Sequence, residues 1–255
     1  MFALQIQPDG GPYEDRFEIA ADLADIVNAE LHRCVDAPTG NQSSGGSSGG
    51  SPSEGWAAAA IVQLDDPSFS FHRSGADGAA PVDQGFPQWG PHALAEAAPP
   101  PARELAQLYN RVVRGLRQRG AKLLLHLCFG NFQGRPRTAR SYHSLFPGIL
   151  EARCDQFVLE FAGREMAEAD LWPEFGVDRE LGAGVVDVKS FYPDTPAQVA
   201  GRIRRLLQHV PAERLWLNPD CGLNHSARWV AAAKLRAMVV GTRIVRAELG
   251  CPDRS

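Results

Sequence analysis

The chain has 255 residues, and its 26 lysines and arginines against 30 aspartates and glutamates give a formal net charge of -4. Its content of 44% hydrophobic and 22% charged residues excludes collagen-like, coiled-coil and wholly disordered chains. The charge balance argues against a strongly basic nucleic-acid binder, and no apolar run reaches the roughly 18 residues of a membrane span. Because the first residues also lack a secretory signal pattern, we expect a cytoplasmic protein with reduced thiols.

Segments with the period of a helix alternate with short apolar segments along the chain. In chain order, we predict a strand at 2–6, a helix at 16–35, a strand at 59–64, a helix at 103–119, a strand at 122–127, a helical stretch at 144–152, strands at 156–160 and 184–188, a helix at 197–209, a strand at 215–217 and a helix at 228–248. We expect a single domain over 1–255, with a flexible insertion at about 38–55, where Ser and Gly dominate and cannot build a core.

The alternation of strands and helices predicts a parallel sheet, and continuous apolar strands predict that helices cover it. Polar residues lie at or just after the ends of most of the predicted strands: Asp65, His126 and Cys128, Glu160, Asp187 and Lys189, and Asn218 to Cys221. In a (β/α)8 barrel, chemistry lies at the carboxyl ends of the strands. We therefore expect an α/β fold like the (β/α)8 TIM barrel. The predicted strands number six, whereas a closed barrel of this type needs eight, so either further strands escape the sequence pattern or the chain lacks the first strands of the fold.

The cysteines number five, which is odd, so they cannot all form disulfides, and metal or catalytic roles are open to some of them. His126 and Cys128 are two residues apart in a strand and therefore point the same way. Together with Glu160 and Cys221 at other strand ends, they offer the imidazole, thiolate and carboxylate ligands that Zn2+ takes. Their wide spacing is unlike that of a zinc finger and fits ligands gathered from separate strands.

Several segments, in the same order, resemble the catalytic barrel of the cobalamin-independent methionine synthase family. They are His126-Leu127-Cys128-Phe129-Gly130-Asn131-Phe132, the strand end at Glu160, Gly184 to Ser190, and Asn218-Pro219-Asp220-Cys221-Gly222-Leu223. The segment Ile61 to Pro67 also resembles the end of a middle strand of that barrel. The shared order of several motifs makes the resemblance specific, and it runs from Arg16 to Leu249 apart from the insertion.

The family transfers an alkyl group, usually methyl, to a zinc-bound thiol, usually that of homocysteine. The resemblance therefore implies a zinc-dependent methyltransferase whose zinc ligands are His126, Cys128, Glu160 and Cys221. It implies that Asp65 holds the ammonium group of the substrate. A thiol with a pKa of about 8.5 is mostly protonated at neutral pH, and zinc stabilises the nucleophilic thiolate. We expect Glu160, the hardest ligand, to loosen or leave when the substrate sulfur binds.

Lys189 stands where methionine synthases carry a histidine that assists the leaving group, and lysine there resembles the core-type and coenzyme M-type branch. On this basis Asp187 and Lys189 serve the alkyl donor, which is a folate, a methyl-corrinoid or an epoxide-like electrophile. The family's first strands, whose loops contact the amino-acid substrate, have no counterpart that we find. We expect a second copy of the chain or a partner chain to supply them, and we expect no nucleic-acid or membrane partner.

Each candidate residue also has a structural interpretation. These alternatives are buried thiols for Cys128 and Cys221, a salt bridge to Arg164 for Glu160, a turn cap for Asp65, a buried ion pair for Asp187 and Lys189, and loop-shaping roles for Asn218 and Asp220. Asn131 is a candidate for contacting the substrate or, alternatively, for orienting the loop that follows His126.

Two other functions stand beside methyl transfer to homocysteine. One is a transferase or lyase that joins another thiol, such as coenzyme M, to an epoxide-like electrophile, and an assay of homocysteine against other thiols separates it. The other is a zinc-binding partner subunit without catalysis, which co-purification of a second chain carrying the missing strands would support.

Overall fold

The computed structural model describes residues 11–36, 61–65, 101–131, 134, 136 and 140–251, so the predicted strand at 2–6 and the insertion at about 38–55 lie outside it. The described strands are β1 (Ile61–Asp65), β2 (Lys122–Leu127), β3 (Gln156–Leu159), β4 (Glu180–Val186) and β5 (Leu215–Pro219). The described α-helices are α1 (Arg16–Asp36), α3 (Ala102–Val112), α4 (Leu171–Glu174), α5 (Pro196–Leu206) and α6 (Arg228–Glu248). None of these helices is both long enough and apolar enough to cross a membrane.

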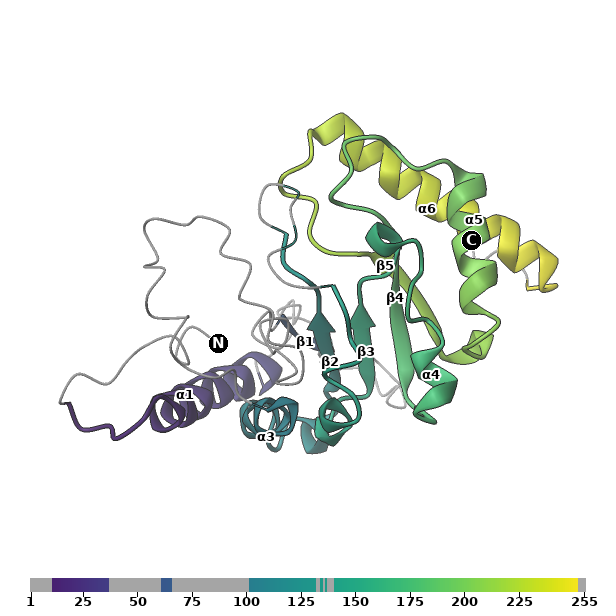
Figure 1. Ribbon diagram of the computed structural model, residues 1–255. Helices are drawn as coiled ribbons and strands as arrows, with labels where there is room; N and C mark the ends of the chain where they lie inside the picture. The colour runs from purple at the N-terminus through teal and green to yellow at the C-terminus, as the bar shows by residue number, and fades with distance from the viewer. Residues whose placement is uncertain are drawn as a thin grey trace, which may run out of the picture.

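The described strands form one 5-stranded sheet in the order β1-β2-β3-β4-β5, and every neighbouring pair is parallel (Figure 1). Each strand pairs with the next one in the sequence, and the order never reverses as it does in doubly wound folds. Successive parallel strands joined through helical connections are the winding of a (β/α)8 barrel. The predicted α/β, TIM-barrel-like fold class is therefore confirmed.

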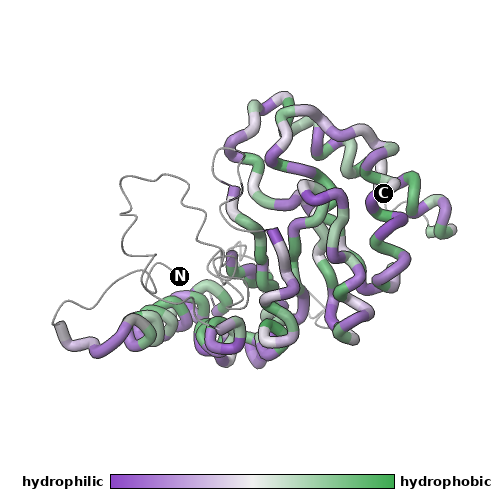
Figure 2. The backbone as a smooth tube through the Cα atoms, viewed as in Figure 1, coloured by the Kyte–Doolittle hydropathy of each residue, from purple (hydrophilic) through white to green (hydrophobic). Residues whose placement is uncertain are grey.

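One face of the sheet is apolar and covered by helices. Alternate residues of β2, namely Leu123, Leu125 and Leu127, point to this face and are 2%, 0% and 2% exposed. The same core continues through the neighbouring strands with Val62, Phe157, Leu159, Leu181, Ala183 and Val185. Helices α5 and α6 pack on each other and on β4, and α1 packs on α3 (Figure 1). Apolar and polar residues interleave along these helices, as amphipathic covering helices require (Figure 2).

The opposite face of the sheet is largely polar. The strand register places these residues side by side on it: Lys122, His126, Gln156, Glu180 and Asn218. A Cβ atom on Gly182, which shares this face, would lie 3.0 Å from Oδ1 of Asn218 and 3.1 Å from Cγ2 of Val158. The glycine therefore lets neighbouring side chains close over the strand. In a barrel this face lines the interior, where a site of polar residues belongs.

The largest differences between the predicted elements and the structure concern three segments. Strand β4 begins at Glu180 rather than at 184, because residues 180–183 pair in register with β3, which outweighs the weak strand preference of their sequence. The predicted helical stretch at 144–152 contains only a short 3-10 turn at Gly148–Glu151, since Pro147 has no N–H to donate to a helix. The predicted helix at 103–119 is α-helical only to Val112 and closes with a 3-10 turn at Arg117–Arg119.

Candidate metal centre

The carboxyl ends of the strands bring the predicted site residues to one edge of the sheet. His126 lies at the end of β2, Glu160 directly follows β3, and Cys221 follows β5. By strand register, Asp65 of β1 lies beside His126. Because parallel strands all end at the same edge, residues far apart in the sequence become neighbours there.

Three side chains at this edge form a compact set of metal-ligating atoms. One ligand atom each from His126, Cys128 and Cys221 lies within 4.8 Å of the other two. The sulfur atoms of Cys128 and Cys221 are 3.7 Å apart. Two thiolates on one tetrahedral zinc ion, each about 2.3 Å from it, would be about 3.8 Å apart. The sulfur separation therefore fits a shared zinc ion.

A backbone carbonyl orients the imidazole of His126. The side chain is buried, and its Nδ1 lies 3.1 Å from the carbonyl oxygen of Val158 on β3. This contact leaves Nε2 as the nitrogen that can bind a metal, a common arrangement in metal sites. Burial acts to lower the pKa of His126, but hydrogen bonding to Cys221 and the negative charge of Asp65 outweigh it, so the pKa is raised.

The two thiols have opposite pKa shifts. The pKa of Cys221 is lowered by its hydrogen bond with Cys128 and then by its hydrogen bond with His126. The pKa of Cys128 is raised by the same sulfur–sulfur hydrogen bond and by burial. Cys221 is therefore the sulfur that carries the negative charge, and Cys128 is the donor. A metal ion must displace the proton of Cys128 before it binds both sulfurs.

Glu160 lies at the same edge, and its carboxylate faces a lysine. The residue is fully buried, and its Oε2 accepts a hydrogen bond from Nζ of Lys189 at 2.6 Å and one from the N–H of Phe129 at 3.3 Å. The alternative salt bridge to Arg164 is wrong, because Arg164 pairs with Glu168 at 2.6 Å. The oxygens of Glu160 are not in the three-residue ligand set, so its role as a zinc ligand stays a prediction.

Asp187 and Lys189 do not form the buried ion pair that was the alternative to a functional role. Oδ1 of Asp187 instead accepts the backbone N–H groups of Lys189 at 2.8 Å and Ser190 at 3.2 Å, which shapes the turn after β4. The ammonium group of Lys189 goes to Glu160, with only 7% of the lysine side chain exposed. The roles of Asp187 and Lys189 toward an alkyl donor stay predictions.

Comparison with known protein families finds a match over the part of the chain that carries these residues. A family model described as "Cobalamin-independent synthase, Catalytic domain" matches residues 104–243, which is more than half of the chain and includes His126, Cys128, Glu160 and Cys221. The chain belongs to the cobalamin-independent methionine synthase family. The family predicted from the sequence motifs is therefore confirmed.

Curated members of the methionine synthase family align along most of the chain. A methionine synthase of Saccharolobus islandicus is 30% identical over 237 residues, which cover 93% of this chain and 54% of that relative. A methionine synthase of Sulfurisphaera tokodaii is 27% identical, with 93% of this chain and 52% of that relative covered. The chain thus spans about half the length of the curated relatives it matches.

A solved structure supports the fold. The structure of a B12-independent methionine synthase from Shewanella sp. W3-18-1 in complex with selenomethionine superposes with a TM-score of 0.65 at 22% identity, covering 94% of this chain and 58% of that one. At this identity the likeness concerns the fold alone.

Asp220 joins the loop of Cys221 to the loop of Glu160. Its fully buried carboxylate accepts the N–H groups of three successive residues, Phe161 at 3.0 Å, Ala162 at 2.9 Å and Gly163 at 2.6 Å. Burial and the charge of Glu160 raise the pKa of Asp220 to about 7 against these hydrogen bonds. Asp220, which precedes Cys221, thus holds the backbone that follows Glu160.

Two buried side chains that support the site were not predicted. The hydroxyl of Tyr142 accepts the N–H of Glu160 at 2.8 Å and lies 3.1 Å from the carbonyl oxygen of Leu127, so it joins the ends of β2 and β3. Nζ of Lys234 donates to the carbonyls of Asp187 at 2.8 Å and Tyr192 at 2.7 Å, which holds the loop after β4. No sequence signal marks Tyr142, whereas Lys234 lies on the buried stripe of α6, where a charge needs a partner.

Asp65 and Asn131 are the residues predicted to contact the substrate. Asp65 is exposed at the end of β1, and its Oδ1 accepts a hydrogen bond from Nε2 of Gln63 at 2.8 Å. Nδ2 of Asn131 donates to the carbonyl of Gly222 at 2.8 Å, which ties the loop of Cys128 to the loop of Cys221. Contact of either residue with a substrate stays a prediction.

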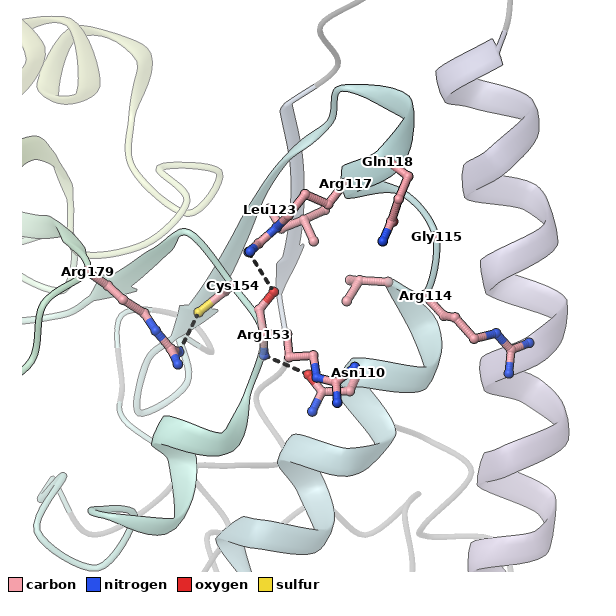
Figure 3. A pocket seen from close by; sticks show the side chains of 10 residues that line it. Asn110, Arg114, Gly115, Arg117, Gln118, Leu123, Arg153, Cys154 and Arg179 are labelled. Atoms are coloured by element: carbon pink, nitrogen blue, oxygen red, sulfur yellow. Dashed lines mark hydrogen bonds between the residues drawn. The ribbon is translucent and has the colours of Figure 1, made fainter.

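A surface cavity of about 430 Å³ lies at the opposite end of the sheet (Figure 3). It includes Leu123 near the start of β2 and Cys154 and Arg179, which precede β3 and β4. The guanidinium of Arg179 points to the sulfur of Cys154 at 3.6 Å, as the dashed line in Figure 3 shows. Because barrel enzymes carry their chemistry at the carboxyl ends of the strands, this cavity is separate from the candidate metal centre.

Proposed function

We propose that the chain catalyses zinc-dependent transfer of a methyl group to the thiol of homocysteine. The observation that carries the proposal is the set formed by His126, Cys128 and Cys221, whose ligand atoms lie within 4.8 Å of one another in a chain of the cobalamin-independent methionine synthase family. The relatives that match most of the chain carry the name methionine synthase, which supports homocysteine as the acceptor.

The donor set fits zinc. Thiolate and imidazole are ligands that zinc takes in proteins, and these three side chains would leave a fourth position for Glu160 or for the substrate sulfur. Zinc bound there would supply the Lewis acidity that keeps a substrate thiol in its thiolate form near neutral pH.

Contacts within the chain orient the residues of this site without a bound substrate. The carbonyl of Val158 holds the ring of His126, and Asp220 holds the backbone after Glu160. We assign the ammonium group of homocysteine to Asp65, which is exposed beside His126. We propose that the methyl donor binds on the side of the site where β4 ends, where Asp187 and Lys189 would contact it.

The described sheet ends at β1 and β5, where side chains remain open to solvent. Ile61 of β1 is 67% exposed and Trp216 of β5 is 52% exposed. We propose that the chain is one barrel-type domain whose edge strands are covered by strands of a second copy or of a partner chain. Light scattering on the purified, active protein tests this proposal, and full activity of a strict monomer would contradict it.

Zinc content and thiol methylation test the proposed function together. We expect about one zinc ion per chain by elemental analysis, and a Cys221→Ser variant with much less. With a methyl donor, we expect product from homocysteine rather than from coenzyme M. A folded protein without zinc would overturn the proposal, and turnover of coenzyme M with an epoxide in its place would redirect it to the second candidate reaction.

A further inference from the structure

The ion pair between Lys189 and Glu160 is almost completely buried. Nζ of Lys189 lies 2.6 Å from Oε2 of Glu160, and the two side chains are 7% and 0% exposed. A surface ion pair adds little to stability, but a buried carboxylate that loses its partner costs several kcal/mol. Lys189 is therefore what makes a buried, charged Glu160 tolerable in this arrangement.

Two further carboxylates lie close to that of Glu160. A Cβ atom on Gly163 would lie 3.3 Å from Oε1 of Glu160, 3.3 Å from Oδ1 of Asp187 and 3.2 Å from Oδ2 of Asp220. Oε1 of Glu160 is buried and has no hydrogen-bond partner among the described residues. The hydrogen bonds that this carboxylate accepts thus go to its other oxygen, from Lys189 and from the N–H of Phe129.

Resting on the proposed function, we propose that Lys189 is a positioning residue that competes with the metal ion for the carboxylate of Glu160. The sequence motifs imply that Glu160 is a zinc ligand, whereas the structure shows its carboxylate bound to Lys189. One carboxylate thus has two cationic partners. Lys189 holds it when it is away from the metal, and the fourth position is then open to a substrate sulfur.

The physical reason is the cost of an unpaired charge. If Glu160 left the metal without Lys189 beside it, its carboxylate would be a buried anion next to Asp187 and Asp220, with one long hydrogen bond from a backbone N–H. Lys189 removes most of that cost, because an ammonium group at hydrogen-bond distance replaces the metal as the counter-charge. The lysine therefore weakens Glu160 as a metal ligand and favours entry of the thiol.

Simple charge repulsion between Lys189 and a metal cation predicts part of the same behaviour. Removal of the lysine would then tighten metal binding whether or not Glu160 is present. Competition for the carboxylate predicts that the effect disappears when residue 160 has no charge. A double-mutant cycle of Lys189→Met and Glu160→Gln separates the two explanations.

Cobalt substitution gives a readout that does not depend on turnover. Co2+ would be titrated into wild type, Lys189→Met, Glu160→Gln and the double variant, and its visible absorption would report the ligands. We expect Lys189→Met to bind Co2+ about tenfold more tightly, with an altered spectrum, and to bind homocysteine about tenfold more weakly. In the Glu160→Gln background, the same lysine change should alter neither affinity nor spectrum.

Two further variants serve as controls. Lys189→Arg keeps the charge and should restore wild-type affinities. Lys122→Met removes a lysine of the same sheet face that is 2.5 Å from Glu180 at the other end of the strands, and it should leave Co2+ and homocysteine binding unchanged. If Lys189→Met does not fold, Lys189→Gln takes its place.

The outcomes separate this inference from the proposed function. If wild type binds no Co2+ or Zn2+, the proposed function fails and the inference fails with it. If wild type binds metal and homocysteine, but Lys189→Met changes neither affinity nor spectrum, only the inference is overturned. An equal effect of the lysine change with and without the Glu160 charge would also overturn it in favour of repulsion.

Discussion

Gly184 of β4 lies against Asp220, the residue that precedes Cys221. A Cβ atom on Gly184 would lie 2.1 Å from Oδ1 of Asp220 and 2.8 Å from its Cα atom. The N–H of Asp220 donates to the carbonyl of Val186 on the same strand at 3.0 Å. The loop that carries Cys221 can therefore lie on β4 only because residue 184 has no side chain.

Gly184→Ala is expected to destabilise the protein by about 1–3 kcal/mol, since the backbone of Asp220 must move to admit the methyl group. The same displacement moves Cys221, so zinc affinity should fall as well. Gly222→Ala is the matched control, because a Cβ atom there meets nothing within 4 Å. Urea unfolding and zinc competition with a chelator measure both effects, and equal behaviour of the two variants would contradict the prediction.

The raised pKa of Asp220 predicts how stability depends on pH in chelator-treated protein. Its pKa is about 7 in the folded protein, against a value of about 3.9 in an unfolded chain. Between these pH values the native state holds a proton that the unfolded state has lost. The titration of Asp220 should therefore lower the free energy of unfolding as the pH rises from about 4 to about 7. The lowered pKa of Cys221 acts in the opposite direction, so the contribution of Asp220 is measured as the difference between wild type and a variant that lacks its carboxyl group.

Asp220→Asn removes this titration, so wild type should lose stability relative to the variant as the pH rises over that range. The variant should also be less stable at low pH, because an amide nitrogen cannot accept a backbone N–H as a side-chain oxygen of Asp220 does. Urea unfolding at several pH values measures both effects. An unchanged slope would show that Asp220 titrates near its ordinary pKa.

Zinc binding is expected to strengthen as the pH rises. The pKa of Cys128 is raised by its hydrogen bond with Cys221 and by burial, so zinc must release its proton. The raised pKa of His126 adds a second proton that zinc must displace. Chelator competition between about pH 6 and 8 should show the affinity rising by about tenfold or more per pH unit. In Cys128→Ser the pH dependence should be weaker, and a pH-independent wild type would contradict this prediction.

Tyr142 and Tyr109 are two buried tyrosines whose hydroxyl groups differ. Tyr142→Phe removes the acceptor of the Glu160 N–H and should cost about 1–3 kcal/mol, with weaker zinc binding because the ends of β2 and β3 loosen. The hydroxyl of Tyr109 is buried without a hydrogen-bond partner among the described residues, so Tyr109→Phe should be neutral or slightly stabilising. Thermal unfolding and zinc content compare the two variants. Equal losses of stability would refute the distinction.

The order of elements and the ligand set follow largely from local patterns. Alternating strand and helix segments predict parallel pairing of successive strands, and this pairing is what the sheet shows. The spacing of His126 and Cys128, with Cys221 after a later strand, is enough to predict that all three meet. Parallel strands end at a common edge, so residues at strand ends become neighbours whatever their separation in the sequence.

Only the tertiary structure decided the partners of the charged groups. The sequence suggested Arg164 as a partner of Glu160 and Asp187 as a partner of Lys189, but Glu160 and Lys189 pair with each other across two strand ends. Adjacency in sequence is a poor guide here, because a buried charge takes whichever opposite charge the packing brings within hydrogen-bond distance. The boundaries of β4 likewise depended on pairing with β3, which local preference does not contain.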